Sequence, residues 1–256
     1  HMTEAQKRAY VIADNKLALN AGWDDEMLVA EFDDLKDAGF DLELTGFTLD
    51  EIEKLMPEQI NEGLTDEDDA PSIPDEPKTK RGDIYQLGKH RLMCGDSTFI
   101  DDVEKLMQGT YPDLIHTDPP YGMNAVSKSS VLKKNYKTDI LGDDTPDVAK
   151  DAFNLIYGLY PDAKHIWWAW ANFRSVVRQF TKASEKANRV HPTQKPVALM
   201  EWIIKRFKLS ANTIADYFGG SGSTLIAAEK HNIQAFIMEF DPKFCDVIVK
   251  RWEDYT

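Results

Sequence analysis

Apolar residues recur at helical intervals in the first part of this chain of 256 residues. Between Asp24 and Leu55 they are spaced as on two amphipathic helices, and Thr48 stands where it can cap the second one. The apolar positions of this pattern are Met27, Leu28, Phe32, Leu35, Leu49, Ile52 and Leu55. The pattern predicts a small acidic helical module over residues 1–60.

After residue 80 the pattern changes to short apolar runs that alternate with helical stretches. This alternation predicts an α/β domain with a largely parallel sheet over residues 81–256. The expected strands are Arg91–Cys94, Leu114–Thr117, Ile166–Trp170, Thr213–Ala215 and Ala235–Met238. Most of them are followed by a carboxylate. Ligands of open parallel sheets bind beyond the carboxyl ends of the strands, so we expect these acids to gather along one edge.

The segment between the two parts, residues 61–80, is acidic, contains three prolines and has almost no large apolar side chains, which is typical of a linker. Charge is distributed unevenly around it. Residues 1–76 contain 22 Asp and Glu against 5 Lys and Arg, a net charge of −17, whereas residues 77–256 contain 22 acids and 25 bases, a net charge of +3. The second part is therefore compatible with a polyanionic partner.

The composition excludes collagen-like, low-complexity and disulfide-scaffold proteins. No apolar run approaches the roughly 18 to 20 residues of a membrane span, and no signal-peptide pattern opens the chain. We therefore expect a cytoplasmic protein with no membrane partner.

The segment Asp118-Pro119-Pro120-Tyr121 follows the expected strand Leu114–Thr117. Its prolines fix φ and lack backbone donors, which leaves the Pro119 carbonyl as an acceptor beside the Asp118 carboxylate. Such a pair fits an NH₂ group, and Tyr121 offers a ring on which a planar base can stack. Taken alone, the motif is equally compatible with a strand that leads into a capped helix and a tight turn.

A glycine-rich segment, DYFGGSGST at residues 216–224, leads from a strand into the expected helix Leu225–Lys230. Glycines let a backbone approach a ligand closely and direct N–H groups at it. The segment is neither a G-x-G-x-x-G fingerprint nor a P-loop, because the third glycine and the Lys-Ser/Thr pair are missing. Glu239 ends the next strand, where Rossmann-like sheets hold ribose hydroxyls. A turn with a purely structural role is the alternative interpretation.

Both segments occur together with HPTQKP at residues 191–196. On these motifs, and in this order, the chain resembles the β-class, circularly permuted, S-adenosylmethionine-dependent DNA amino-methyltransferases over about residues 81–256. It is most similar to adenine-N6 enzymes of phage and prophage type. Gly95-Asp96 also looks like the family's opening segment. The resemblance implies an α/β, Rossmann-like methyltransferase sheet with DNA as the partner.

The resemblance also implies a role for each matching residue. The catalytic residues would be Asp118, Pro119, Pro120 and Tyr121. S-adenosylmethionine would be the cofactor, and no metal would be required. Its methionine end would be surrounded by Asp216, Phe218, Gly220 and Gly222, its carboxylate held by Thr193 and Lys195, its ribose by Glu239 and its adenine amino group by Asp96. Without the resemblance, Lys195 would be interpreted as a solvated charge and Asp96 as a helix cap.

The N-terminal residues Tyr10–Lys16 and Leu44–Phe47 look like the tail of a ParB-like domain of the kind fused to phage methyltransferases. We expect the core of such a domain to be missing, so we assign no nuclease or nucleotide-binding chemistry to this part. We expect the module to pack against the catalytic domain or against a second subunit of a homodimer.

The stretch from Ala171 to Val190 is short for this family, which carries its target-recognition segment and a strand hairpin at this place. It has the pattern of one helix and a polar connector, and neither resembles a hairpin. Either the protein is a shortened variant with missing strands, or a recognition segment near residues 181–190 is omitted from the sequence. We favour the omission, because the loss of core strands would expose an edge of the sheet.

Several alternatives to an adenine-N6 methyltransferase remain at this point. A cytosine-N4 enzyme is the nearest, although that group more often has Ser in place of Asp118. RNA as the substrate is disfavoured by the permuted order, and an intact DPPY disfavours a non-catalytic ParB-like DNA-binding protein. A cytosine-C5 enzyme is disfavoured because neither Cys94 nor Cys245 follows a proline.

Overall fold

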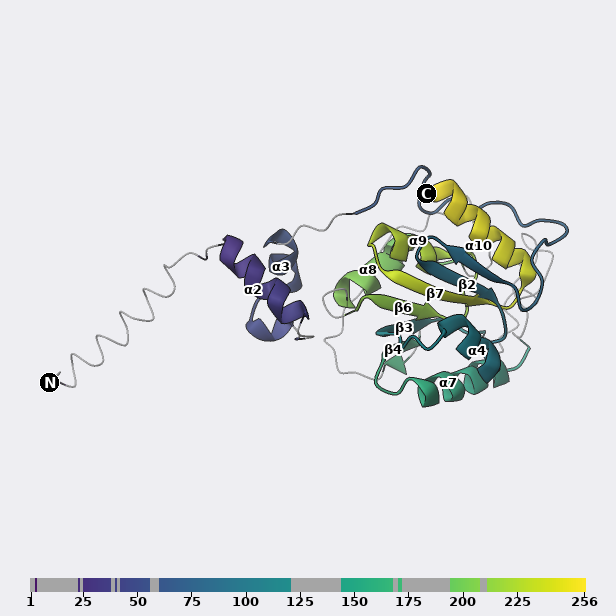
Figure 1. Ribbon diagram of the computed structural model, residues 1–256, viewed down its shortest axis with the longest axis horizontal. Helices are drawn as coiled ribbons and strands as arrows, with labels where there is room; N and C mark the ends of the chain where they lie inside the picture. Colours follow the sequence, from purple (N-terminus) through teal and green to yellow (C-terminus); the bar gives the residue numbers. More distant parts are fainter. Residues whose placement is uncertain are drawn as a thin grey trace. The chain divides into compact units, whose positions relative to one another are not determined.

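The chain divides into two compact units, residues 1–58 and residues 59–256. The computed structural model describes residues 3, 23, 25–37, 40, 42–55, 60–120, 144–167, 170–171, 194–207 and 211–256. The ParB-like stretch Tyr10–Lys16, the expected helix and connector after Ala171, and the expected omission near 181–190 lie outside these residues. The acidic segment 61–80, expected as a linker, belongs to the second unit (Figure 1).

The first unit contains helix α2 (Asp25–Asp37), a 3-10 helix η1 (Leu42–Thr45) and helix α3 (Leu49–Leu55). Of the apolar positions expected from the spacing, Leu28, Phe32 and Ile52 are buried, whereas Met27 is 65% exposed. Leu42, which the pattern did not include, is buried as well. The Thr48 hydroxyl accepts a hydrogen bond from the Glu51 N–H at 3.3 Å, and the Glu51 carboxylate accepts the Thr48 N–H at 2.8 Å. This reciprocal pair is a capping box, and it confirms Thr48 as the N-cap of α3.

The second unit is built on a seven-stranded sheet within the described residues, with the order β1-β2-β7-β6-β3-β4-β5. Neighbours in the series β2, β7, β6, β3 and β4 are parallel, whereas β1 and β5 are antiparallel at the two edges. The strands are β1 (Ile84–Leu87), β2 (His90–Cys94), β3 (Leu114–Thr117), β4 (Lys164–Trp167), β5 (Trp170–Ala171), β6 (Thr213–Asp216) and β7 (Gln234–Glu239). The expected α/β class is therefore confirmed.

Two details of the sheet differ from the sequence-based expectation. The single strand expected over Ile166–Trp170 was wrong, because Trp167 and Trp170 are antiparallel partners in β4 and β5. The chain therefore reverses direction between them. Strand β1 was not expected, since only Leu87 of its four residues is buried and the apolar signal is correspondingly weak.

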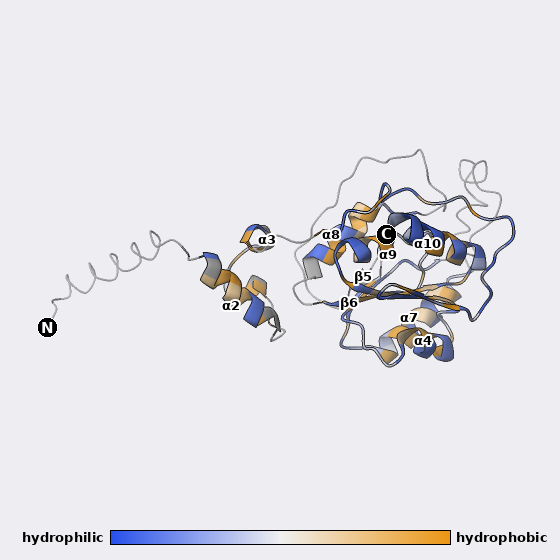
Figure 2. Cartoon of the chain, turned by 45° about the horizontal axis from the view of Figure 1, so that its top comes forward, coloured by the Kyte–Doolittle hydropathy of each residue, from blue (hydrophilic) through white to orange (hydrophobic). Residues whose placement is uncertain are grey.

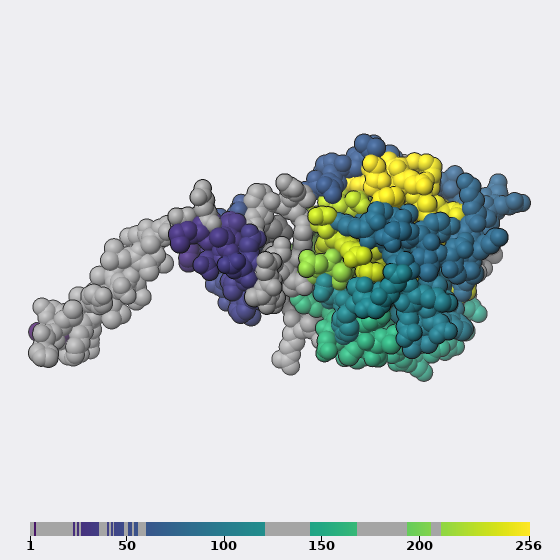
Figure 3. Space-filling view, viewed as in Figure 1, coloured from purple at the N-terminus to yellow at the C-terminus, as the bar shows by residue number. Residues whose placement is uncertain are grey.

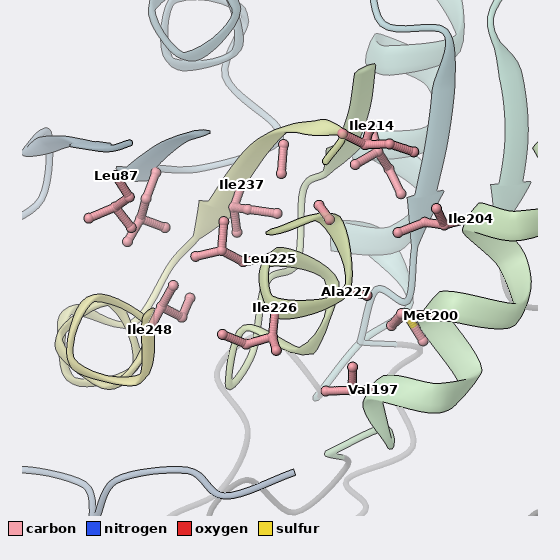
Figure 4. Close-up of a cluster of buried hydrophobic side chains, with 14 of the residues drawn as sticks. Leu87, Val197, Met200, Ile204, Ile214, Leu225, Ile226, Ala227, Ile237 and Ile248 are labelled. Atoms are coloured by element: carbon pink, nitrogen blue, oxygen red, sulfur yellow. The ribbon is translucent and has the colours of Figure 1, made fainter. Parts of the chain in front are cut away.

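Helices cover both faces of the sheet (Figure 1). On one face lie α8 (Val197–Phe207), α9 (Ser223–Lys230) and α10 (Pro242–Tyr255), and on the other lie α4 (Ile100–Met107) and α7 (Asp147–Leu159). Figure 2 shows hydrophobic and hydrophilic residues on different sides of several of these helices, as expected for helices that bury one face against a sheet. The core on the α8–α10 side includes Leu87, Val197, Met200, Ile204, Ile214, Leu225, Ile226, Ala227, Ile237 and Ile248 (Figure 4). None of the described helices is long and apolar enough to cross a membrane.

Residues 60–80, here called the strap, run across the surface of the second unit. The backbone N–H of Leu64 donates to the Tyr255 carbonyl at 2.8 Å, and the Asp246 carboxylate accepts the backbone N–H of Lys78 at 2.6 Å. At Gly63 a Cβ atom would overlap the Tyr255 ring, so the strap can approach α10 closely only with glycine there. The strap and α10 lie together in Figure 3 (blue and yellow). Polar and backbone contacts thus dock a segment that has few apolar side chains to bury.

Candidate active site

The carboxyl ends of β2, β7, β6 and β3 lie along one edge of the sheet. The register pairs Cys94 with Glu239 and Asp216 with Ile237, and all these strands are parallel. At the end of β3, the Thr117 hydroxyl donates to Asp216 at 3.1 Å. The expected gathering of acids at this edge is therefore confirmed for Asp216 and Glu239, and Asp118 follows directly on β3.

Asp216 is the last residue of β6 and is only 5% exposed. Besides the Thr117 hydroxyl, its carboxylate accepts the Phe218 N–H at 3.1 Å and the Thr224 hydroxyl at 2.6 Å. The glycine-rich segment 216–224 is here called the glycine loop. These bonds connect its start with the first turn of α9. Burial raises the pKa of Asp216 to about 6. The carboxylate thus holds the two ends of the loop together. In return, a charge is buried at neutral pH, which is unfavourable.

The shape of the loop requires glycine at several positions. Gly220 has φ +55° and Gly222 has φ +85°, in the left-handed region that side-chain-bearing residues rarely adopt. Gly219 is constrained by space, because a Cβ atom there would lie 2.5 Å from the Ile237 Cγ2 atom. The backbone of the loop therefore lies directly against β7.

Glu239 ends β7 and is partly buried. One carboxylate oxygen accepts the Gly220 N–H at 2.7 Å, and the other accepts the Asp241 N–H at 2.8 Å. Burial raises the pKa of Glu239 to about 7, and the charges of Asp241 and Asp216 act in the same direction. A carboxylate has about four lone-pair sites, so both oxygens retain capacity for hydroxyl donors of a ligand.

Asp96 lies in the turn after β2. It accepts hydrogen bonds from the backbone and hydroxyl of Thr98 at 2.9 and 2.7 Å, and Arg81 approaches it to 3.7 Å. The Arg81 guanidinium lies 3.5 Å from the centre of the Phe240 ring and donates to the Phe240 carbonyl at 2.8 Å. Arg81 thus connects Asp96 with the residue that follows Glu239. Neither Arg81 nor Phe240 was expected from the sequence, although an aromatic residue that directly follows a strand-ending acid could have indicated Phe240.

Asp118 forms an ion pair with Lys195, in which Nζ lies 2.6 Å from the carboxylate oxygen Oδ2. Lys195 precedes α8, and its carbonyl accepts the Ser223 hydroxyl of α9 at 2.7 Å. The resemblance places Lys195 at the cofactor carboxylate, and the structure brings it to the candidate catalytic acid. Asp118, Lys195 and the start of α9 therefore form one connected group.

His116 is two residues before Asp118 in β3 and is 2% exposed. Neither ring nitrogen has a hydrogen-bond partner in the described part of the chain. Burial lowers its pKa to about 4, so the ring is neutral at physiological pH. His116 was not expected as a site residue, although a histidine inside an apolar strand was a visible signal in the sequence.

The other expected site residues are placed unevenly. Pro119 is buried and Pro120 is partly buried after Asp118, and Phe218 is partly buried in the glycine loop. Tyr121 and Thr193 lie outside the described residues. Within the described ranges, no group of three or more His, Cys, Asp or Glu residues is arranged to hold a metal ion.

Two family models match parts of the chain. Residues 129–250 match a family model described as a DNA methylase of the N6/N4 type, which includes Lys195, the glycine loop and Glu239. Residues 26–81 match a family model described as a ParB-methyltransferase HTH domain, a range that includes α2 from its second residue, α3 and the strap. No curated protein sequence matches the chain. Residues 129–250 are therefore similar to DNA methylases of the N6/N4 type, and residues 26–81 are similar to the HTH domain of ParB-methyltransferases.

Proposed function

We propose that the second unit transfers a methyl group from S-adenosylmethionine to the exocyclic N6 amine of adenine in DNA. The observation that carries this proposal is the position of Asp118. It follows β3 at the edge that holds Asp216 and Glu239, and Lys195 connects it to the first turn of α9 through the Ser223 hydroxyl. An acid suited to an amine and a loop suited to a nucleoside cofactor are thus neighbours.

The donor set of the edge fits the proposed cofactor. Glu239 has lone pairs left for ribose hydroxyls, Asp96 can accept from an amino group, and Lys195 is a cation suited to a carboxylate. The glycine loop allows close approach of a ligand to the backbone. When bound, the cofactor supplies a methyl group that is already activated on a sulfonium.

The residues of the chain then have to orient the amine. The Asp118 carboxylate and the Pro119 carbonyl would accept hydrogen bonds from the two N–H groups of the amine. The nitrogen lone pair would then be available to attack the methyl group. The negative charge of Asp118 would stabilise the amine as it becomes cationic. The target base must leave the DNA stack to reach this edge, and Tyr121 is proposed as its stacking partner.

Three features favour the more specific assignment. Asp, rather than the Ser that is more frequent in cytosine-N4 enzymes, occupies position 118. Strand β3, which Asp118 follows, precedes β6, which leads into the glycine loop. This order along the chain supports the permuted β-class arrangement. The ParB-methyltransferase match supports a phage or prophage type.

Methylated nucleosides test the proposal. Unmethylated genomic DNA at low salt and high concentration is incubated with the chain and labelled cofactor, then digested and analysed by mass spectrometry. We expect N6-methyl-deoxyadenosine. N4-methyl-deoxycytidine would exclude the adenine assignment, and no methylated nucleoside at all would exclude the activity.

Asp118→Ala is the matched variant. We expect it to lower turnover by about 100-fold or more, because both alignment and charge stabilisation are lost, while cofactor affinity stays within about threefold. Asp118→Asn keeps one acceptor without the charge and separates these two contributions. The control is Asp75→Ala, at an exposed acid of the strap. Retained turnover in Asp118→Ala would show that the active site is elsewhere.

A further inference from the structure

We propose that Asp68 of the strap is a positioning residue, which holds the start of α8 so that Lys195 stays against Asp118. This inference rests on the proposed function and extends it to a segment that the sequence predicts as a mere linker. No feature of the acidic segment 61–80 marks Asp68 among its neighbours in the sequence.

Asp68 holds the Lys195 segment from two sides. Its carboxylate accepts the backbone N–H of Val197, the first residue of α8, at 2.7 Å. Its backbone carbonyl accepts the side-chain amide of Gln194 at 3.2 Å. Lys195 lies between these two contacts, and Pro196 has no N–H of its own to contribute. One residue of the strap therefore contacts the side chain of the residue before Lys195 and the backbone N–H two residues after it.

The strap is itself fixed beside Asp68. The Glu67 carbonyl accepts a hydrogen bond from Arg251 at 2.6 Å, and the Glu67 carboxylate forms an ion pair with Lys230. Arg251 is 2% exposed and also donates to the Ser221 carbonyl of the glycine loop at 2.8 Å. The strap thus shares one buried arginine with the loop that is proposed to hold the cofactor.

Lys195 is also held at both its backbone carbonyl and its ammonium group. Its carbonyl accepts the Ser223 hydroxyl at 2.7 Å, while its Nζ lies 2.6 Å from Asp118. With the backbone held by Asp68 and Ser223, the long side chain has few positions in which it can reach the acid. Loss of the Asp68 contact would release the start of α8, and small displacements of a catalytic group have large effects on rate.

The experiment compares Asp68→Ala, Asp68→Asn and the control Asp75→Ala in the full chain. We expect Asp68→Ala to lower the kcat of methyl transfer by about tenfold, since the Val197 N–H loses its acceptor. Asp68→Asn retains an acceptor oxygen and should recover to within about threefold of the unmodified chain. Asp75→Ala should leave kcat unchanged.

A double-mutant cycle separates positioning from a general structural role. Calorimetry with S-adenosylhomocysteine measures affinity in the Lys195 and Lys195→Met backgrounds. We expect Asp68→Ala to weaken affinity several-fold with Lys195 present and to have little effect once Lys195 is replaced. Equal fold-changes in both backgrounds, or an Asp68→Ala variant indistinguishable from Asp75→Ala, would overturn the positioning role alone. An unmodified chain that binds the analogue but methylates no DNA would instead contradict the proposed function.

Discussion

Replacement of Asp216 by Asn should stabilise the second unit at alkaline pH, although it alters a residue of the candidate site. The Asp216 carboxylate accepts bonds from the Thr117 hydroxyl, the Phe218 N–H and the Thr224 hydroxyl. An amide can retain all three, because its oxygen accepts the first two and its NH₂ group donates to the Thr224 oxygen. The Thr224 hydroxyl can then donate to the Met200 sulfur, which lies 3.5 Å away. The substitution therefore removes the buried charge and keeps the hydrogen bonds.

The magnitude follows from the pKa of Asp216, which burial raises from 3.8 to about 6. Above both values the carboxyl is ionised in the folded and unfolded chain, and its burial lowers the stability of the folded state. Two pKa units correspond to about 3 kcal/mol, so Asp216→Asn should be more stable by up to this amount at pH 8. As pH falls, the folded state takes up its proton first, and the advantage should shrink to about 0.5 kcal/mol at pH 4.

Urea denaturation at pH 8, 6 and 4 measures this difference in the free energy of unfolding. Asp75→Asn, at an exposed position, serves as the control and should show no comparable dependence on pH. An Asp216→Asn variant less stable than the unmodified chain at pH 8, or a difference that is the same at all three pH values, would contradict a destabilising buried charge at Asp216. Cofactor affinity is expected to fall in the same variant, since the proposed site loses a negative charge beside the loop.

Three further predictions concern the loop, the cofactor acid and the strap. Gly219→Ala should destabilise the fold by about 1 to 3 kcal/mol, because its Cβ atom would overlap Ile237, whereas Gly158→Ala in helix α7 meets no atom and should be neutral or stabilising in thermal unfolding. Glu239→Ala should weaken cofactor binding by about 1 to 3 kcal/mol in calorimetry. It should also abolish the decline in affinity that we expect for the unmodified chain below about pH 7, where Glu239 takes up a proton. Asp246→Ala should release the end of the strap, and faster proteolytic cleavage within residues 70–80 would report this; unchanged cleavage would contradict it.

The buried strands of the second unit were predictable because each is a short apolar run covered on both faces. A strand that is buried on both faces is apolar at every position, so it can be recognised without knowing its pairing register. The acids that follow such strands mark the carboxyl edge of the sheet. Thr48 likewise acts on neighbouring backbone groups, so its role as an N-cap was expected from local sequence. Strand β5 has two residues and exists only through its pairing with β4, which no local pattern encodes.

The sequence by itself determined the helical module, the α/β class and the acids at strand ends, because the apolar patterns that indicate helices and buried strands are local in the sequence. Tertiary structure alone decided the partners of Lys195 and of the strap. Asp118 and Lys195 meet because β3 and the start of α8 converge at one edge, and Asp68 meets Val197 because Arg251 and Lys230 hold Glu67 beside it. An acidic, proline-containing composition predicts a linker, since the cations and N–H groups that dock it belong to distant parts of the sequence and become its neighbours only on folding.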